Sequence, residues 1–252
     1  MFDLIRAFDL TAGNWVLLAV GGALIGMTKA GLRGVAILAI PIYATIFGGR
    51  PSSGIVLPLL ITGDIFAVIY YSPHARWSYV LKLLPWSLTG VILGLIVGGS
   101  ISDESFTILM AILILVSIGI LVYRELRPGE ISVPDTWWMA AILGVAAGFT
   151  TMIGNAAGSL MTLYLLAMGL PKSEFIGTGA WYFFIVNVLK VPLHAAFWGT
   201  VTWQTLALDL MIVPAILLGA FVGLAIVKRI PEKPYRVFVL VTTFIAAVRL
   251  FF

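Results

Sequence analysis

Gly22-Ala-Leu-Ile-Gly26-Met-Thr28-Lys29-Ala-Gly31-Leu-Arg33-Gly34 is the stretch that decides the fold of this chain. A counterpart follows about half the chain later: Gly144-Val-Ala-Ala-Gly148-Phe-Thr-Thr151-Met-Ile-Gly154-Asn155-Ala-Ala-Gly158. Both begin with Gly-x-x-x-Gly in an apolar run and then pass into a short polar, glycine-rich patch. Because glycine lowers helix stability, we expect the helix to break at each patch. Inside a membrane, broken backbone is tolerated only where protein or a water-filled cavity covers it.

The composition is that of a membrane protein. Of 252 residues, 61% are hydrophobic and only 10% are charged, and the mean hydropathy is +1.10. Apolar segments of about 20 residues match the length that a helix needs to cross a bilayer. We therefore predict an all-α polytopic membrane protein. The absence of cysteine excludes disulfides and thiolate chemistry, and the start of the chain lacks the basic region of a signal peptide.

The apolar segments divide into two similar halves. Pro51 and His74 are 23 positions apart, as are Pro171 and His194. We expect a first repeat at 1–123, a cytoplasmic linker at 124–136 and a second repeat at 137–252. Each repeat would hold one broken element and three transmembrane helices. The expected elements are 15–47 (broken at 29–34), 53–71 after a turn at 48–51, 79–99, a fourth helix that ends at 123, 137–168 (broken at 150–158), 173–198, 204–227 and a last helix that ends at 252.

The distribution of charge predicts how the halves are oriented. The loop after the first repeat holds Arg124 and Arg127, and the loop before the last helix holds Lys228 and Arg229. The positive-inside rule places both loops in the cytoplasm, although they occupy different positions in their repeats. For this to hold, each half of the chain must cross the membrane an odd net number of times. The broken elements would then enter and leave the membrane on the same side, as re-entrant hairpins or close helix pairs. We predict two inverted-topology repeats. If each broken element is a single crossing, the repeats are parallel instead.

Gly-interrupted segments at matching places in two halves indicate a transporter's binding site. Lys29 and Arg33 would lie at mid-depth, where a cation costs roughly 2.5–3.5 kcal/mol and needs a partner or a ligand. The helix N-termini after the two breaks add partial positive charge and free N–H groups. Together these groups predict an anion site. The alternative is that the glycines only permit close helix packing and that Arg33 extends to the interface.

Two further sets of polar residues fall inside apolar segments. Asn187, Lys190 and His194 have the spacing of one helical face and would line a pathway, or Lys190 would form a bridge that locks helices together. We expect His194 to lie at the membrane edge. Asp64 would be the counter-ion of Lys29 or Lys190, or else a proton carrier, and Asp209 is a similar candidate for charge balance or coupling.

The remaining motifs limit the chemistry. The chain has no His-Glu-x-x-His, Gly-x-Ser-x-Gly or Walker sequence and no cluster of carboxylates for a divalent metal. We therefore expect no enzyme activity, no metal and no cofactor. The scattered net charge of +4 indicates topology and no nucleic-acid partner.

Lys29, Gly31 and Gly34 followed by Pro41, together with Asn187-x-x-Lys190-x-Pro192, resemble the TauE/SafE family of sulfite and organosulfonate exporters. The two-half plan and the length are also similar to that family. The resemblance implies secondary transport of a small sulfur-containing anion such as sulfite or a sulfonate. The second half has Thr150-Thr151 where Lys29 would align, so the cationic part of the site would be asymmetric.

These observations predict a secondary transporter in a bacterial type of plasma membrane, working by alternating access as one repeat rocks against the other. The expected partners are a small anion, the lipid bilayer and a coupling proton or ion, and the sequence does not give the oligomeric state. The alternatives are an anion channel and an intramembrane lipid-modifying enzyme. The predicted substrate-binding residues are Thr28, Lys29, Gly31, Arg33, Gly34, Thr151, Gly154, Asn155, Asn187 and Lys190.

Overall fold

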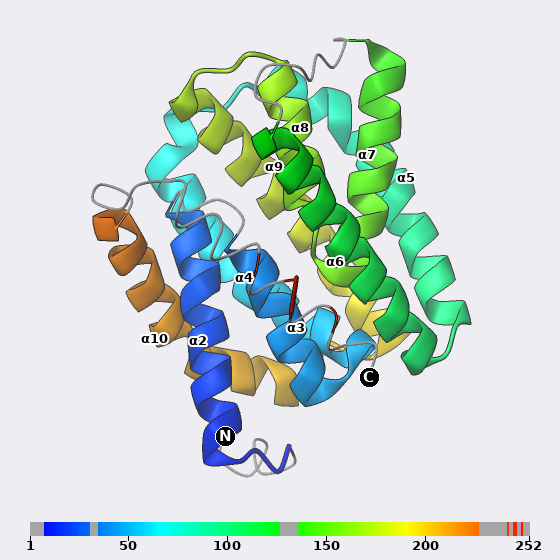
Figure 1. The fold of residues 1–252 in the computed structure, drawn as a ribbon, viewed down its shortest axis with the longest axis vertical. Coiled ribbons are helices and arrows are strands. Elements are labelled where there is room, and N and C mark those ends of the chain that lie inside the picture. The colour runs from blue at the N-terminus through cyan, green and yellow to red at the C-terminus, as the bar shows by residue number, and fades with distance from the viewer. Residues whose placement is uncertain are drawn as a thin grey trace.

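The computed structural model describes residues 8–30, 35–126 and 136–226, with the isolated positions 241, 244, 245 and 248. It is built from helices that lie side by side (Figure 1). Three predicted substrate-binding residues, Gly31, Arg33 and Gly34, lie outside the described residues, as does most of the predicted last helix. The helices are α2 (Ala12–Lys29), α3 (Ala36–Phe47), α4 (Gly49–Tyr71), α5 (Trp77–Ser100), α6 (Asp103–Leu126), α7 (Trp137–Gly154), α8 (Gly158–Ala167), α9 (Lys172–Leu193) and α10 (Trp203–Ile226).

Six described helices are long and apolar enough to cross a membrane, which confirms the prediction of a polytopic all-helical membrane protein. They correspond to α4, α5, α6, α7, α9 with the π-helix His194–Trp198, and α10. The second arms of the broken elements, α3 and α8, have 12 and 10 residues. At about 1.5 Å per residue, neither arm reaches across a hydrocarbon core of about 30 Å.

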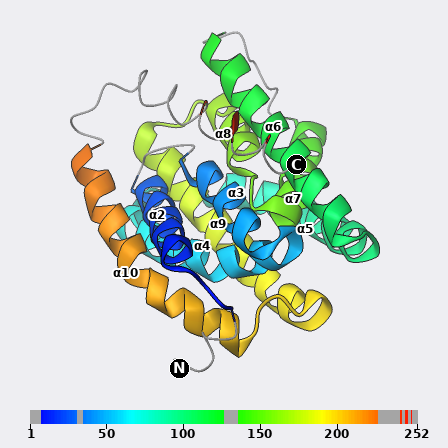
Figure 2. The same cartoon turned by 60° about the horizontal axis from the view of Figure 1, so that its bottom comes forward.

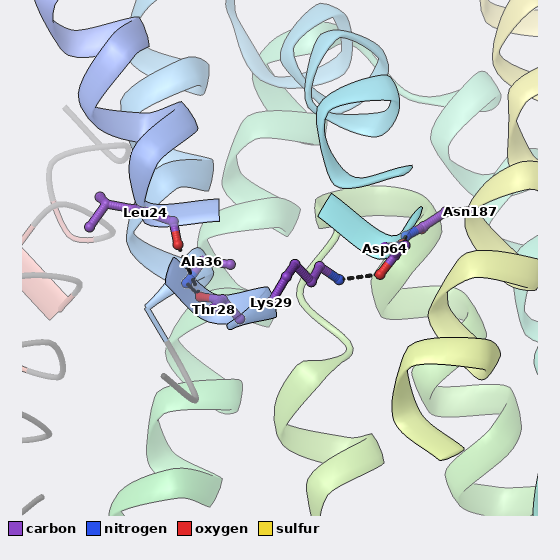
Figure 3. Close-up of polar contacts among 6 residues, drawn as sticks. All are labelled: Leu24, Thr28, Lys29, Ala36, Asp64 and Asn187. Atoms are coloured by element: carbon purple, nitrogen blue, oxygen red, sulfur yellow. Dashed lines mark hydrogen bonds and ion pairs between the residues drawn. The ribbon is translucent and has the colours of Figure 1, made fainter. Parts of the chain in front are cut away.

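Both predicted helix breaks are present, and local chemistry explains how the chain makes them. Asn155 ends α7 in the left-handed conformation, with φ at 51°. Asparagine tolerates this conformation better than most residues do. The first break is bridged by Thr28, whose hydroxyl accepts from the Ala36 N–H at 2.7 Å and donates to the Leu24 carbonyl at 3.1 Å. Thr28 thereby caps the start of α3 from the end of α2 (Figure 3).

Some predicted boundaries are wrong by a few residues. The turn expected at 48–51 is reduced to Gly48, which has φ at 85°, and α4 already begins at Gly49. Pro51 fits inside the first turn of α4 because its missing N–H would have no partner there in any helix. Helix α6 continues to Leu126, beyond the predicted end at Tyr123.

Two hydrophobic cores group the helices into two bundles. One core joins α2, α3, α4 and α10 and contains Tyr43, Leu59 and Ile212. The other joins α5, α7, α8 and α9 and contains Val91, Met152 and Tyr182. We refer to these groups as the first bundle and the second bundle. Helix α6 packs against α3 and α7, one from each bundle, through a third core. Each bundle therefore combines helices from both halves of the sequence.

The glycines of the two broken elements set the packing within each bundle. Gly22 faces Ile212 and Gly26 faces the backbone carbonyl of Ile216, so α2 and α10 are parallel. In the same way Gly144 faces Leu83 and Gly148 faces the backbone of Ser87 and Val91, so α5 and α7 are parallel. A Cβ atom at Gly26 or Gly148 would overlap the neighbouring backbone, which is why these sites need glycine.

Helices α4 and α9 meet between the bundles, with α2 and α10 on one side and α5 and α7 on the other (Figures 1 and 2). They are antiparallel. Gly54, near the start of α4, faces Thr200, which follows α9, whereas Asp64, later in α4, bonds Asn187, which lies earlier in the chain than Thr200. Large apolar side chains such as Ile69, Leu218 and Phe221 are exposed on the outside, as expected of a surface that faces lipid. Asp64, Asn187 and Lys190 are buried at this junction.

Candidate functional site

Lys29, Asp64 and Asn187 form one polar cluster at the junction, which we call the Asp64 cluster (Figure 3). The last residue of α2, Lys29, places its Nζ atom 2.5 Å from Asp64 Oδ1. Asn187 Nδ2 on α9 donates to the other oxygen, Oδ2, at 2.8 Å. Asp64 is fully buried, whereas 12% of the Lys29 side chain is exposed. The carboxylate is thus held by one cation and one amide, as a buried carboxylate requires.

A second polar cluster surrounds Lys190, and we call it the Lys190 cluster. The buried Nζ atom donates to the Thr151 carbonyl at 2.7 Å, to Thr151 Oγ1 at 3.2 Å and to Asn155 Oδ1 at 2.6 Å. Asn155 Nδ2 in turn donates to the Ser53 carbonyl of α4 at 3.0 Å. The end of α7 is therefore tied to α9 by an ammonium group and to α4 by an amide.

The two clusters place a cation at each broken element by different routes. In the first broken element the cation, Lys29, belongs to the break itself. In the second, Thr151 occupies the aligned position and Lys190 reaches it from α9. Asn187, which bonds Asp64, lies about one helical turn before Lys190 on α9. The two clusters thus contain two lysine side chains and one carboxylate.

Most of the predicted site residues that the structure describes meet at this junction. Gly154 lies between Thr151 and Asn155 at the end of α7 and packs against Met110. Asp209 does not join either cluster, since it lies in α10 within the core of the first bundle. No group of three or more His, Cys, Asp or Glu side chains suited to a metal ion occurs in the part of the chain that the structure describes.

The position of His194 at the membrane edge stays a prediction, but its side chain lies inside the protein. Its side chain is fully buried in the π-helix that follows α9, with Nδ1 2.9 Å from Thr200 Oγ1. The π-helix turns the chain toward α10, and the Gly199 residue that ends it has φ at 61°. His194 lies near the end of the expected span 173–198, where the sequence gives no pattern from which this burial could be predicted.

Two contacts of the site were not predicted from the sequence. The Phe183 ring lies 5.1 Å from Lys29 Nζ, a distance at which an aromatic face attracts a cation. The Ser53 carbonyl accepts from Asn155. A phenylalanine in an apolar span and a backbone carbonyl have no distinctive sequence pattern, so neither contact could be found before the fold was known.

Comparison with known proteins is consistent with this architecture. The family model "Sulfite exporter TauE/SafE" matches residues 18–250. The chain is also 22% identical, over 198 residues, to a protein of Paramagnetospirillum magneticum named "Probable membrane transporter protein MamO". That match covers 63% of this chain but only 31% of the relative, so the chain spans about a third of the relative's length. Since the family model covers nearly the whole sequence, the chain belongs to the TauE/SafE sulfite exporter family of membrane transporters.

Proposed function

We propose that this protein is a secondary transporter of a small sulfur-containing anion, sulfite or an organosulfonate, in a bacterial cytoplasmic membrane. The observation that carries this proposal is the environment of Lys190. Its ammonium group is fully buried, and the three oxygen atoms that accept its hydrogen bonds are all neutral. Asp64, the carboxylate of the other cluster, is already bonded to Lys29.

A buried cation without its own counter-ion is costly, and a second cation nearby raises that cost. A bound anion would supply the missing charge. Sulfite and sulfonates carry several oxygen acceptors, which suit ammonium groups and backbone N–H donors. The family to which the chain belongs supports this substrate class.

Several donors could reach an anion between the clusters. Lys29 is the more accessible of the two cations, with 12% of its side chain exposed. The N-terminus of α8 begins at the exposed Gly158, and the buried Ser159 hydroxyl next to it has no hydrogen-bond partner among the described residues. Helix N-termini present free N–H groups and partial positive charge. An anion held there would compensate Lys190 without displacing Asp64.

The arrangement of helices supports inverted-topology repeats. In the two proposed repeats, α2 corresponds to α7 and α5 corresponds to α10. Helix α2 packs parallel to α10, and in the same way α7 packs parallel to α5. The remaining equivalent pair, α4 and α9, is antiparallel. In Figure 1, α2 and α10 begin at the bottom of the view, whereas α5, α7 and α9 begin at the top. An axis in the membrane plane that exchanges the two bundles would relate these pairs, as alternating access requires.

The experiment that tests this function is counterflow of labelled sulfite in proteoliposomes, competed by sulfate, thiosulfate, small sulfonates and carboxylates. Saturable exchange that one of the sulfur anions inhibits would support the proposal. Flux without exchange or saturation would favour an anion channel instead, and product formation from a lipid would favour an enzyme. A folded protein that exchanges none of these anions would refute the proposal.

Substitution of Lys190 by methionine tests the observation directly. Losing a hydrogen bond to a charged group costs about 1.5–3 kcal/mol, so the apparent affinity for the anion should fall about 10- to 150-fold. The matched control neutralises a surface ion pair with Arg76→Gln and Glu174→Gln. Arg76 Nε lies 2.7 Å from Glu174 Oε2, and both residues lie away from the two clusters. The control should exchange anions as the wild type does, and unchanged affinity in a folded Lys190→Met protein would contradict the role of Lys190.

A further inference from the structure

Asp209 is a buried carboxyl group that neither cluster uses. Only 4% of the residue is exposed. Neither Oδ1 nor Oδ2 has a hydrogen-bond partner in the part of the chain that the structure describes. This sets Asp209 apart from Asp64, whose two oxygens are bonded to Lys29 and Asn187. A carboxylate in such a place would lose its hydration and receive no donor in exchange.

The surroundings of Asp209 are apolar. Its neighbours Leu208 and Ile212 belong to the core of the first bundle, and Ile212 packs against Gly22 of α2. Tyr43 of α3 is also fully buried in that core. The Tyr43 hydroxyl donates its hydrogen to the Leu18 carbonyl at 3.0 Å, so it does not stabilise an anion at Asp209.

The other titratable groups on the helices packed against α10 are engaged elsewhere. Lys29 of α2 and Asp64 of α4 pair with each other. Arg50 of α4 donates to the Ile101 carbonyl and lies over the Phe106 ring. Tyr70 of α4 stacks on Phe66, which contacts Phe221 of α10. Phe221 is about 18 Å along the helix from Asp209. The described helices around Asp209 thus direct no cation at it.

An isolated carboxylate in a low-dielectric interior costs several kcal/mol, and the group avoids that cost by holding a proton. We propose that Asp209 is a proton-binding site of this protein, protonated while buried and releasing its proton to water when the start of α10 opens. The step is balanced: the carboxylic acid becomes a carboxylate, water accepts the proton, and the reverse occurs on reclosure. Trp203, at the exposed start of α10, is about 9 Å along the helix, so the path to water is short.

This site would couple anion transport to proton movement, a consequence that rests on the proposed function. The first bundle contains both Asp209 and the Asp64 cluster. Close glycine packing holds α2 against α10 from Gly22 to Gly223, which packs against Met27 and Ala30 beside Lys29. Asp209 and Lys29 therefore lie toward opposite ends of one closely packed interface. A displacement of α10 that admits water to Asp209 would be transmitted along this interface to Lys29.

Infrared spectroscopy of the protein reconstituted in lipid at pH 7 tests the protonation state without any transport assay. The wild type should show the C=O stretching band of a protonated carboxylic acid, and Asp209→Asn should lose it. Glu104→Gln is the matched control, because Glu104 is exposed at the start of α6 and its loss should leave the band unchanged. Persistence of the band in Asp209→Asn, or its absence from the wild type, would overturn the proposal. Asp209→Leu provides a second variant that should fold, since a neutral buried acid is replaceable by an apolar side chain.

Transport then tests the coupling. Asp209→Asn should retain sulfite counterflow but lose accumulation driven by an imposed pH gradient, because exchange does not require a net proton step. Equal gradient-driven accumulation in wild type and Asp209→Asn would refute the coupling. If the wild type exchanges no anion at all, the proposed transport function fails, whereas the infrared result still decides whether Asp209 holds a proton.

Discussion

A double-mutant cycle on Lys29 and Asp64 measures how the site balances its charges. Lys29→Met leaves Asp64 fully buried, with Asn187 as its remaining hydrogen-bond donor among the described residues. Removing one partner of a buried pair costs about 3–5 kcal/mol, because the other charge stays desolvated. Asp64→Asn leaves Lys29 with 12% of its side chain exposed and the Phe183 ring 5.1 Å away. That ammonium can turn toward water, so the loss should be smaller, about 1–3 kcal/mol.

The double variant, Lys29→Met with Asp64→Asn, removes both charges and both desolvation costs. Replacing a buried ion pair by neutral groups is often close to neutral for stability, so we expect the double variant to fall within about 1 kcal/mol of the wild type. The two single effects should therefore not add, and the coupling free energy should be at least about 3 kcal/mol. Unfolding in mixed micelles, followed by the fluorescence of the 8 tryptophans, provides the measurement.

Two results would refute this reasoning. Additivity of the single variants within about 0.5 kcal/mol would show that Lys29 and Asp64 do not act as a pair. A larger loss of unfolding free energy for Asp64→Asn than for Lys29→Met would show that the carboxylate does not depend on the ion pair more than the ammonium group does. The same cycle on Arg76 and Glu174 is the control. Because 59% of the Arg76 side chain is exposed, water screens that pair and its coupling should be near the limit of detection.

Three other predictions concern packing and topology. Gly26→Ala and Gly148→Ala should each lower stability by about 1–3 kcal/mol in the same unfolding assay, because the added methyl group meets backbone. Gly119→Ala in α6, with nothing within 4 Å of its Cβ position, should instead raise stability by about 0.5–1 kcal/mol; equal effects at all three sites would contradict the packing. Tyr182→Phe should cost about 0.5–1.5 kcal/mol by removing the 2.8 Å bond to Ser87 Oγ, and Ser87→Ala should abolish that difference. Single cysteines introduced at the exposed positions Pro51 and Pro171 should react with a membrane-impermeant reagent from opposite sides, and labelling from one side would refute inverted repeats.

The sequence allowed much of the fold to be predicted, because its main determinants are local. Apolar length and two glycine-rich interruptions predicted the spans and both breaks, and the structure places the breaks at Lys29 and Asn155. The helix ends were less predictable. Pro51 was expected to mark a turn but is accommodated in the first turn of α4, since a proline there removes no hydrogen bond.

The partners of the polar residues were harder to predict, because they depend on distances between remote parts of the chain. The sequence showed Asp64 as a counter-ion for either of two lysines, and the fold selects Lys29 by bringing the end of α2 to the middle of α4. The sequence also has Thr151 at the position that aligns with Lys29, so the second half lacks a cation there. It did not show that Lys190 would reach that position from α9. Nor could the sequence show that each bundle combines helices from both halves, because α2 and α10, which pack together, are far apart in the chain.

This grouping bears on the proposed alternating access, because it suggests which parts of the protein would move. Rocking of one sequence half against the other would shear the glycine interfaces of α2 with α10 and of α5 with α7, where backbones are in contact. Movement of the first bundle against the second would leave both interfaces intact. Each ammonium group would also keep its own partners, because Lys29 and Asp64 lie in the first bundle whereas Lys190, Thr151 and Asn155 lie in the second.

The side-chain hydrogen bonds of the two clusters that cross between the bundles are then those of Asn187 with Asp64 and of Asn155 with the Ser53 carbonyl. Exchanging such bonds for water costs about 0.5–1.5 kcal/mol each, or more where a charge accepts. The polar part of the junction therefore opposes opening by a few kcal/mol, the range in which a minor conformation stays populated and a ligand can shift the balance. An anion that accepts hydrogen bonds from donors of both bundles would replace these contacts in one conformation of the junction but not in the other. Its binding would therefore shift the balance between the two conformations.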